Sequence, residues 1–180
     1  MIHPNHFPIS WIPIPIGKNT KKLGISYCPG KQPINSTNKA DLKNDLQSIS
    51  NQEIKCIVSL LTTAELSALK IKDFNKNIKM QGFQHYKEEI EDLGIPSQIR
   101  MNSFKELIKN IISEIRRDNN VLIHCNAGMG RSGLVAGVIL QEMTELREPI
   151  EYVRKFRKGA IETRGQEEFI KFWQINNNST

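Results

Sequence analysis

Residues 121–132 read VLIHCNAGMGRS. This stretch is the most informative one about the fold, because an apolar triplet is followed directly by a polar loop that contains glycine. The triplet Val121-Leu122-Ile123 is short and apolar enough to be a central strand of a parallel sheet. Residues 134–146, after the loop, are apolar on most sides in their first half, which is typical of a buried helix. The stretch therefore predicts a strand, a loop and a helix in direct succession.

Hydrophobic periodicity predicts further strands and helices on both sides of this stretch. Proline alternates with isoleucine and tryptophan over residues 8–16, which predicts an edge strand or an extended arm, because proline donates no ladder hydrogen bond. Thr62 and Glu65 have the spacing of a capping box that starts a short helix. The other predicted strands are residues 54–61 and 82–86. The other predicted helices are residues 42–49, 104–115 and 166–173, and one that starts at Pro149. We also expect a turn at residues 28–30 and an acidic loop over residues 88–97.

Strands that alternate with helices predict an α/β fold, in which helices cover both faces of a central, mostly parallel sheet. The length of 180 residues suits one domain. We expect a single domain over residues 1–175 and a loose C-terminal tail over residues 176–180.

Composition and charge argue against several classes of protein. No apolar run approaches the roughly 20 residues that a membrane-spanning helix needs, and the N-terminus lacks the pattern of a secretory signal. Three cysteines are too few for a disulfide framework. We expect a soluble, cytoplasmic monomer. The formal charge of +6 suggests an anionic partner, although lysines scattered over a solvated surface are the commoner source of such an excess.

The loop after the predicted strand is suited to bind an anion. A loop that leaves a strand and enters a helix presents unpaired backbone N–H groups to one point, and the helix dipole favours negative charge there. Glycine lets the backbone bend around a ligand without a side chain in the way. The residues that we expect to hold a phosphate are Asn126, Ala127, Gly128, Met129, Gly130 and Arg131.

Three side chains of this loop have distinct chemical tasks. A cysteine at a helix N-terminus near arginine is expected to be a thiolate at neutral pH, which makes Cys125 a candidate nucleophile. Arg131 offers a planar fork of donors for two phosphate oxygens, and Ser132 can donate a hydrogen bond to a departing sulfur. The alternative is that Cys125 is a small core residue and that the glycines only form a turn. The spacing of all these residue types in a strand-loop-helix context favours the chemical interpretation.

Residues 124–132 resemble the His-Cys-x5-Arg-Ser/Thr signature of the protein tyrosine phosphatase superfamily. Other segments are similar to the kinase-associated phosphatase subgroup of small dual-specificity phosphatases. They are Leu23-Gly24-Ile25 with Pro29-Gly30, Glu65-Leu66, the loop that ends at Pro96, and Gly159-Ala160-Ile161. The resemblance covers most of the chain, although only the signature is highly specific. It implies the fold of the cysteine-dependent phosphatases.

The resemblance implies hydrolysis in two steps without a cofactor. Cys125 attacks phosphorus, an acid protonates the leaving oxygen, and water then releases phosphate from the cysteine. The family carries this acid as an aspartate on a separate loop, and the matching residue here is Asp92. Its neighbours Glu88, Glu89 and Glu91 are rival candidates for the acid.

The resemblance also implies supporting roles for two residues. Gln166 is where relatives carry a glutamine that positions the hydrolytic water, although helix capping is an equally good interpretation. Glu162 departs from relatives, which tend to have an amide there. His124 ends the strand, and we expect it to orient the loop backbone and to tune the thiolate rather than to act as a base or a ligand.

The histidines and cysteines show no ligand spacing for zinc or iron, so we expect no metal. Cys28 and Cys56 are the candidates for a second thiol that would protect Cys125 by forming a disulfide. A basic cluster lies before the segment 159–161, and we interpret it as a solvated face or as a docking surface for an acidic or phosphorylated partner. It consists of Arg154, Lys155, Arg157 and Lys158.

The expected substrate is a phosphorylated protein, with phosphotyrosine as the first target and phosphoserine or phosphothreonine as further targets. The alternative reaction removes phosphate from an inositol lipid or from the 5' end of a nucleic acid, although we expect no nucleic-acid partner. Lipid-directed relatives commonly carry lysine inside the signature loop, whereas Asn126, Ala127 and Met129 are uncharged. A third hypothesis is a silent module that binds phosphopeptides without turnover.

Overall fold

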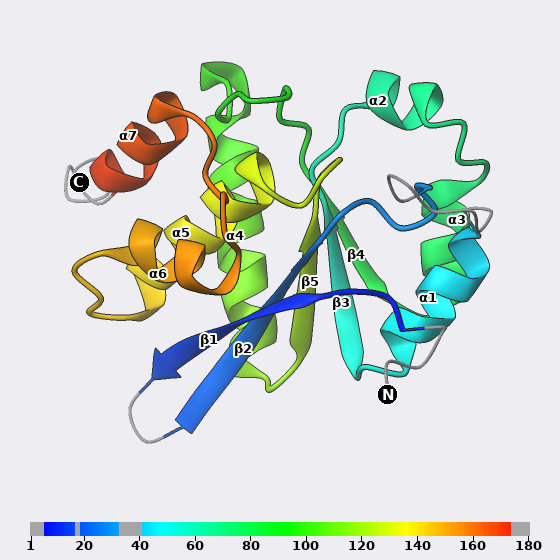
Figure 1. Ribbon diagram of the computed structural model, residues 1–180, viewed down its shortest axis with the longest axis horizontal. Coiled ribbons are helices and arrows are strands. Elements are labelled where there is room, and N and C mark those ends of the chain that lie inside the picture. Colours follow the sequence, from blue (N-terminus) through cyan, green and yellow to red (C-terminus); the bar gives the residue numbers. More distant parts are fainter. Residues whose placement is uncertain (1–5, 17–18, 33–40, 174–180) are drawn as a thin grey trace.

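A five-stranded sheet in the order β1-β2-β5-β3-β4 forms the centre of the computed structural model, which describes residues 6–16, 19–32 and 41–173 (Figure 1). The pairing of β1 with β2 is antiparallel, and β2 with β5, β5 with β3, and β3 with β4 are parallel. The strands are β1 (Ser10–Ile16), β2 (Asn19–Ser26), β3 (Ile54–Ser59), β4 (Gln84–Lys87) and β5 (Asn120–His124). The predicted mostly parallel sheet, with residues 121–123 in a central strand, is therefore confirmed.

Helices cover both faces of this sheet, as predicted. They are α1 (Leu42–Ser50), α2 (Thr63–Ala68), α3 (Phe74–Met80), η1 (a 3-10 turn, Gln98–Arg100), α4 (Met101–Arg116), α5 (Gly130–Met143), α6 (Pro149–Phe156) and α7 (Arg164–Phe172). The side chains of β5 show how the faces divide, because successive residues of a strand point to opposite sides. Val121 and Ile123 pack into the core beneath α4, α5, α6 and α7, whereas Leu122 packs into the second core with α1 and α3.

The proline-rich segment 8–16 contains the edge strand β1, so the prediction of an edge strand is confirmed. Ile12 and Ile14 are buried, and they alternate along the strand with Pro13 and Pro15, which are more exposed. The turn predicted at residues 28–30 is also present, closed by a hydrogen bond from the backbone N–H of Lys31 to the carbonyl of Cys28. The tail predicted over residues 176–180 lies outside the described residues.

Besides the short turn η1, one strand and one α-helix of the structure had no counterpart among the predicted elements. β2 is polar in its first half, where it pairs only with β1, and its apolar residues begin at Leu23, the position at which pairing with β5 begins. α3 has only Phe74 and Ile78 as buried residues, which is too little periodicity to identify a helix. Asp73 before α3 has a positive φ of 51°, and no side-chain hydrogen bond caps this helix.

The helix predicted over residues 134–146 is shifted toward the N-terminus. α5 begins at Gly130, inside the polar loop, and ends at Met143. Its end is explained by Thr144, which has an extended backbone and whose hydroxyl donates a hydrogen bond to the carbonyl of Leu140. The loop is therefore a shorter connection than its polar sequence indicated, and the last three residues of the signature, 130–132, belong to the helix.

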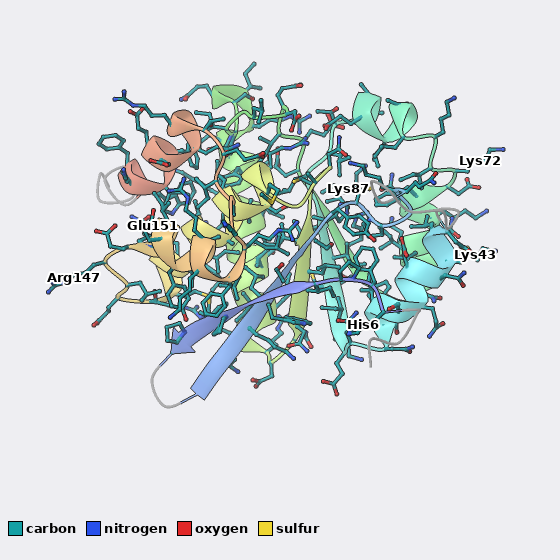
Figure 2. All side chains as sticks on the ribbon, in the orientation of Figure 1. His6, Lys43, Lys72, Lys87, Arg147 and Glu151 are labelled. Atoms are coloured by element: carbon teal, nitrogen blue, oxygen red, sulfur yellow. The ribbon has the colours of Figure 1, made fainter. Side chains whose placement is uncertain are left out.

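The segments that follow the parallel strands meet at one edge of the sheet. Figure 1 shows β2, β3, β4 and β5 running in one direction toward the place where these segments lie together. Lys87, labelled in Figure 2, is the last residue of β4 and marks this edge. Binding sites of parallel α/β sheets form at the carboxyl ends of the strands, so we expect a binding site at this edge of the sheet. None of the helices within the described residues is long and apolar enough to cross a membrane.

Candidate active site

The loop between β5 and α5 folds back against the end of β2. Gly128 has a positive φ of 69°, and a Cβ atom there would lie 2.3 Å from the carbonyl carbon and oxygen of Ser26. Both the backbone conformation and the close approach therefore require glycine. Met129 precedes the first turn of α5, and no side chain caps this helix. The N–H groups of the first turn of α5 therefore receive no side-chain cap from the described residues, as an anion site requires.

Cys125 lies at the bottom of this loop and is only 3% exposed. Its Sγ accepts a hydrogen bond from the backbone N–H of Gly128 at 3.3 Å. A hydrogen bond to a sulfur stabilises the thiolate over the thiol. The sequence placed Cys125 in a strand-loop-helix context, and the structure adds a donor that faces its sulfur.

Arg131 is buried, with 1% of its side chain exposed, and it is held by groups from α2 and from the acidic loop. Its Nη1 and Nη2 donate to the two carboxylate oxygens of Glu65 at 2.7 and 2.8 Å, and Nη1 also donates to the carbonyl of Ile90 at 2.9 Å. Burial alone would lower the pKa of Arg131, but Glu65, Cys125 and Asp92 together raise it above its usual value. The guanidinium therefore stays charged.

Glu65 is a site residue to which the sequence assigned no role in the site, although it lies in a predicted capping box and in a segment similar to the relatives. The capping box exists, since the Thr62 hydroxyl accepts from the Glu65 N–H and the Glu65 carboxylate accepts from the Thr62 N–H. The same carboxylate binds Arg131, which is far away in the sequence. Burial alone would raise the pKa of Glu65, whereas the hydrogen bonds from Arg131 and Thr62 lower it. No local pattern in the sequence could reveal this second partner.

Asp92 is the one member of the acidic loop 88–97 whose carboxylate lies against the signature loop. Its Oδ1 is 2.9 Å from Nη2 of Arg131, and 64% of its side chain is exposed. Glu88 pairs with Arg100 at 3.3 Å, and Glu89 accepts from the backbone N–H and the hydroxyl of Thr63. Glu91 is exposed. Geometry therefore favours Asp92 over its rivals.

Gln166 ties the acidic loop to the start of α7. Its Nε2 donates to the carbonyl of Gly94 at 3.0 Å, and its Oε1 accepts from the backbone N–H of Glu162 at 2.9 Å. Thr163 is the N-cap of α7, and its hydroxyl accepts from the Gln166 N–H, while the Gln166 side chain bonds to backbone groups that precede the helix. Gly130 lets Gln166 approach α5, because a Cβ at Gly130 would lie 3.0 Å from Gln166 Nε2.

His124 is fully buried and belongs to a polar chain across three strands. Ser59 Oγ lies 2.6 Å from His124 Nε2 and 2.8 Å from His85 Nε2. A hydroxyl carries one hydrogen, so Ser59 donates to one ring and accepts from the other. Burial and the neighbouring His85 lower the pKa of His124 to about 3, and burial with the charges of Lys87 and Lys79 lowers the pKa of His85 to about 4. Both rings are neutral at pH 7.

Three polar atoms of the signature are buried without a hydrogen-bond partner among the described residues. They are Nδ1 of His124, Nε of Arg131 and Oγ of Ser132. Buried polar groups are normally paired, so unpaired ones call for an explanation. A donor of Arg131 and the hydroxyl of Ser132 are both available for groups that the protein itself does not supply.

The two other cysteines differ in their distance from the loop. Cys56 is the register partner of Val121, which places it about 13 Å along the strand direction from Cys125, beyond the roughly 7 Å Cα separation of a disulfide. Cys28 lies beside the loop, since its N–H donates to the carbonyl of Asn126 at 3.4 Å. Burial raises the pKa of the Cys28 thiol to about 12. Cys56 is therefore ruled out as a direct partner of Cys125.

The arginines of the basic cluster face inward, whereas Lys155 and Lys158 are exposed. Arg154 donates to the carbonyls of Ala160 and Ile161 and pairs with Glu167 at 2.6 Å. The interpretation of a solvated face is thus right for the lysines and wrong for the arginines. Over the described ranges, no group of three or more histidine, cysteine or acidic side chains could hold a metal ion.

A comparison with protein families finds a match over more than half of the chain. The family model described as "Polymorphic toxin system, DSP-PTPase phosphatase" matches residues 31–144. This range contains the acidic loop with Asp92 and the signature loop with Cys125 and Arg131, and it ends before α6 and α7.

Relatives are found among curated proteins and solved structures. Cyclin-dependent kinase inhibitor 3 of Rattus norvegicus is 24% identical over 166 residues, which are 90% of this chain and 76% of that protein. The structure of a kinase associated phosphatase, in which serine replaces the catalytic-site cysteine, has a TM-score of 0.86 at 22% identity and covers 99% of both chains. The structure of Tk-PTP in its active form has a TM-score of 0.68 at 25% identity and covers 87% of this chain and 92% of that one. These similarities confirm the fold.

Proposed function

The chain belongs to the DSP-PTPase phosphatases of polymorphic toxin systems, and from this premise we propose that it hydrolyses phosphotyrosine, and also phosphoserine and phosphothreonine, through a phosphocysteine on Cys125. It is a cysteine-dependent protein phosphatase of the dual-specificity class. The observation that carries the proposal is the hydrogen bond from the Gly128 N–H to Cys125 Sγ, beside the uncapped start of α5. It supports a sulfur that is held as a thiolate where an anion binds.

In the first step, Cys125 Sγ attacks phosphorus, the S–P bond forms and the P–O bond to the leaving group breaks. Asp92, in its protonated form, gives its proton to the leaving oxygen. The N–H groups of the signature loop and Arg131 stabilise the charge on the phosphoryl oxygens. The pair with Glu65 supports this role, because it fixes the plane of the Arg131 guanidinium before substrate arrives.

The contacts of Arg131 indicate how substrate binding frees the acid. Nη1 donates to Glu65 and to Ile90, and Nη2 faces Glu65 and Asp92, while Nε has no partner among the described residues. Nε and the Nη2 hydrogen that faces Asp92 are therefore the fork for two phosphoryl oxygens. A bound phosphate competes with Asp92 for Nη2 and releases its carboxyl group to the leaving oxygen.

In the second step, water attacks phosphorus, the S–P bond breaks, and the proton of the water passes to Asp92. Ser132 donates its unpaired hydroxyl to the departing sulfur. Gln166 holds the acidic loop through Gly94, and we assign its amide also to the positioning of the water. His124 is a neutral strand-end residue that supports the loop from below.

The proposal extends to the setting of the enzyme. Cys28, Cys56 and Cys125 are free thiols, which supports action in a reducing, cytoplasmic environment. One sheet shared by both cores supports residues 1–175 as one catalytic domain.

A phosphoinositide substrate is a second candidate that one contact favours. Lys31, from the turn after β2, places its Nζ on Asn126, where it donates to the side-chain and backbone oxygens, the latter at 3.3 Å. The signature loop itself is uncharged before Arg131, but this lysine supplies a cation next to it. A second phosphate on a substrate would find a partner there.

The experiment is turnover of a panel of substrates in the presence of a chelator. The panel contains phosphotyrosine, phosphoserine and phosphothreonine peptides and water-soluble phosphoinositides. The proposal predicts release of phosphate from the phosphotyrosine peptide without added divalent ions. Dependence on a divalent ion would contradict the mechanism, and exclusive turnover of phosphoinositides would favour the second candidate.

A further inference from the structure

Arg157, at the end of α6, contacts the backbone of the signature loop from outside the signature. It ends α6, with a non-helical backbone at φ −134° and ψ 86°, so its side chain leaves the direction of the helix. Its Nε donates to the carbonyl of Gly128 at 2.9 Å, and its Nη2 donates to the carbonyl of Ala127 at 3.0 Å. By contrast, Arg147 and Glu151, near the first turn of α6, point outward in Figure 2.

These two carbonyls belong to the peptide units whose N–H groups face the site. In a trans peptide the C=O and N–H bonds point in opposite directions, and the described residues contain no cis peptide bond. The Ala127 carbonyl points to Arg157, so the N–H of Gly128 in the same peptide plane points away from it, toward Cys125 Sγ at 3.3 Å. The Gly128 carbonyl also points to Arg157, so the N–H of Met129 points to the inner side as well.

Successive N–H groups point the same way only where consecutive residues alternate between right-handed and left-handed backbone conformations. The positive φ of 69° at Gly128 provides this alternation, and the resulting concave row of N–H groups binds anions. Each peptide plane can rotate, however, and the outward carbonyls would otherwise be free to turn. The planar fork of Arg157 holds both carbonyls at once, which a single point charge could not do.

We propose that Arg157 is a positioning residue of the phosphatase reaction, which fixes the Ala127–Gly128 and Gly128–Met129 peptide planes so that their N–H groups face the thiolate and the phosphate. Its positive charge at the outer ends of these peptide dipoles strengthens both donors. The inference rests on the proposed function, since it assigns a further residue to the same site. Arg157 has no carboxylate within ion-pair distance in the described parts of the chain, so its charge is directed at the loop.

A purely structural role is the alternative. Nη1 of Arg157 donates to the hydroxyl of Ser10 at 3.3 Å, so the side chain also links α6 to β1. A structural link would affect thermal stability alone, whereas a positioning residue also affects the reactivity of Cys125. The two roles are separated by a measurement of sulfur reactivity in a folded variant.

The experiment measures the rate at which iodoacetamide alkylates Cys125 as a function of pH, together with kcat/KM. Three full-length variants are compared with the wild type: Arg157→Met, Arg157→Lys and the control Lys158→Met. Lys158 is the exposed neighbour of Arg157, so its variant removes the same charge without a loop contact. Thermal unfolding verifies that each variant is folded.

The inference predicts that Arg157→Met moves the pH profile of Cys125 alkylation to higher pH, because a hydrogen bond to the charged form is weakened. It also predicts a fall in kcat/KM of about 10 to 10²-fold, less than the loss of a whole donor. For Arg157→Lys, both the alkylation profile and kcat/KM should lie between those of Arg157→Met and of the wild type. For Lys158→Met, both should match the wild type. If Arg157→Met does not fold, the shift of the alkylation profile in Arg157→Lys tests the inference instead.

An Arg157 variant that is folded and matches Lys158→Met in both measurements would overturn the inference. An equal shift in Lys158→Met would also overturn it, because the effect would then be one of net charge. A wild-type protein without turnover, whose Cys125 reacts like an ordinary thiol, would instead contradict the proposed function. Failure of the two proposals is thus distinguishable.

Discussion

Glu65 and Arg131 form a two-point ion pair in which each carboxylate oxygen accepts from a different guanidinium nitrogen, at 2.7 and 2.8 Å. This geometry fixes the plane of the guanidinium as well as its position. It joins the start of α2 to the start of α5, two helices that follow neighbouring strands of the sheet. The phosphate fork is therefore oriented by a residue outside the signature.

Replacement Glu65→Gln should lower kcat/KM by about 10 to 10²-fold, because an amide has a single accepting atom, so the two-point contact with Arg131 is lost and the fork loses its orientation. Steady-state kinetics on a phosphotyrosine peptide measure this effect. The matched control is Thr62→Ala, which removes the side-chain cap of α2 but leaves the ion pair in place. It should cost about 1 kcal/mol of stability with little loss of activity. Equal losses of activity in both variants would mean that Glu65 acts only through its helix.

Replacement Asp92→Asn should separate binding from turnover. The carboxylate lies 2.9 Å from Arg131 Nη2 and competes with phosphate there, so the variant should bind a phosphopeptide at least as tightly as the wild type. Its kcat should fall by about 10² to 10⁴-fold on a phosphopeptide, and less on an aryl phosphate with an acidic phenol, which needs little protonation. Glu91→Gln is the control. If the leaving-group dependence followed Glu91 instead, the acid would have to be reassigned.

Replacement Arg131→Lys should reduce kcat/KM by about 10² to 10³-fold, since an ammonium group cannot give two parallel hydrogen bonds to phosphoryl oxygens. The carboxylate of Glu65 would also lose one of its partners. Kinetics on the same peptide, with thermal unfolding as a check of the fold, measure the change. A loss of only about twofold would show that Arg131 does not clamp the phosphate.

The buried histidines should make the protein less stable in mild acid. Burial lowers the pKa of His85 to about 4 and that of His124 to about 3 in the folded state, whereas the unfolded chain has the ordinary value of 6.5. Between these values the unfolded state binds more protons, so the free energy of unfolding decreases as pH falls from 6.5 toward 4. Thermal unfolding across this window measures the slope. His85→Gln, whose amide can replace Nε2 beside Ser59, should give a shallower slope, and an unchanged slope would contradict this account.

The core of the site was predictable because its residues are consecutive. The signature loop joins a strand to a helix by local chain geometry, and the order of Cys125, Gly128 and Arg131 carries both the bend and the chemistry. The edge strand β1 was predictable for a similar reason, since its prolines exclude a central position.

The supporting contacts were not predictable, because they join segments that are distant in the sequence. Glu65 has a local capping pattern that hides its pair with Arg131. Arg157 stands among other basic residues, and nothing local distinguishes it from Lys158, although one holds the signature loop and the other is exposed. β2 was not predicted as a strand, because its first half is polar and pairs only with the edge strand β1.

The central claim, a covalent phosphoryl group on Cys125, is tested most directly by rapid acid quenching during turnover of a phosphotyrosine peptide, followed by mass spectrometry of the peptide that contains residues 121–132. We expect a phosphoryl group on Cys125 in the wild type, with a larger trapped fraction in a variant that slows the second step, such as Gln166→Ala. We expect none in Cys125→Ser, which should still bind the phosphopeptide. Sustained turnover by Cys125→Ser, or a phosphoryl group trapped on another residue, would contradict the account.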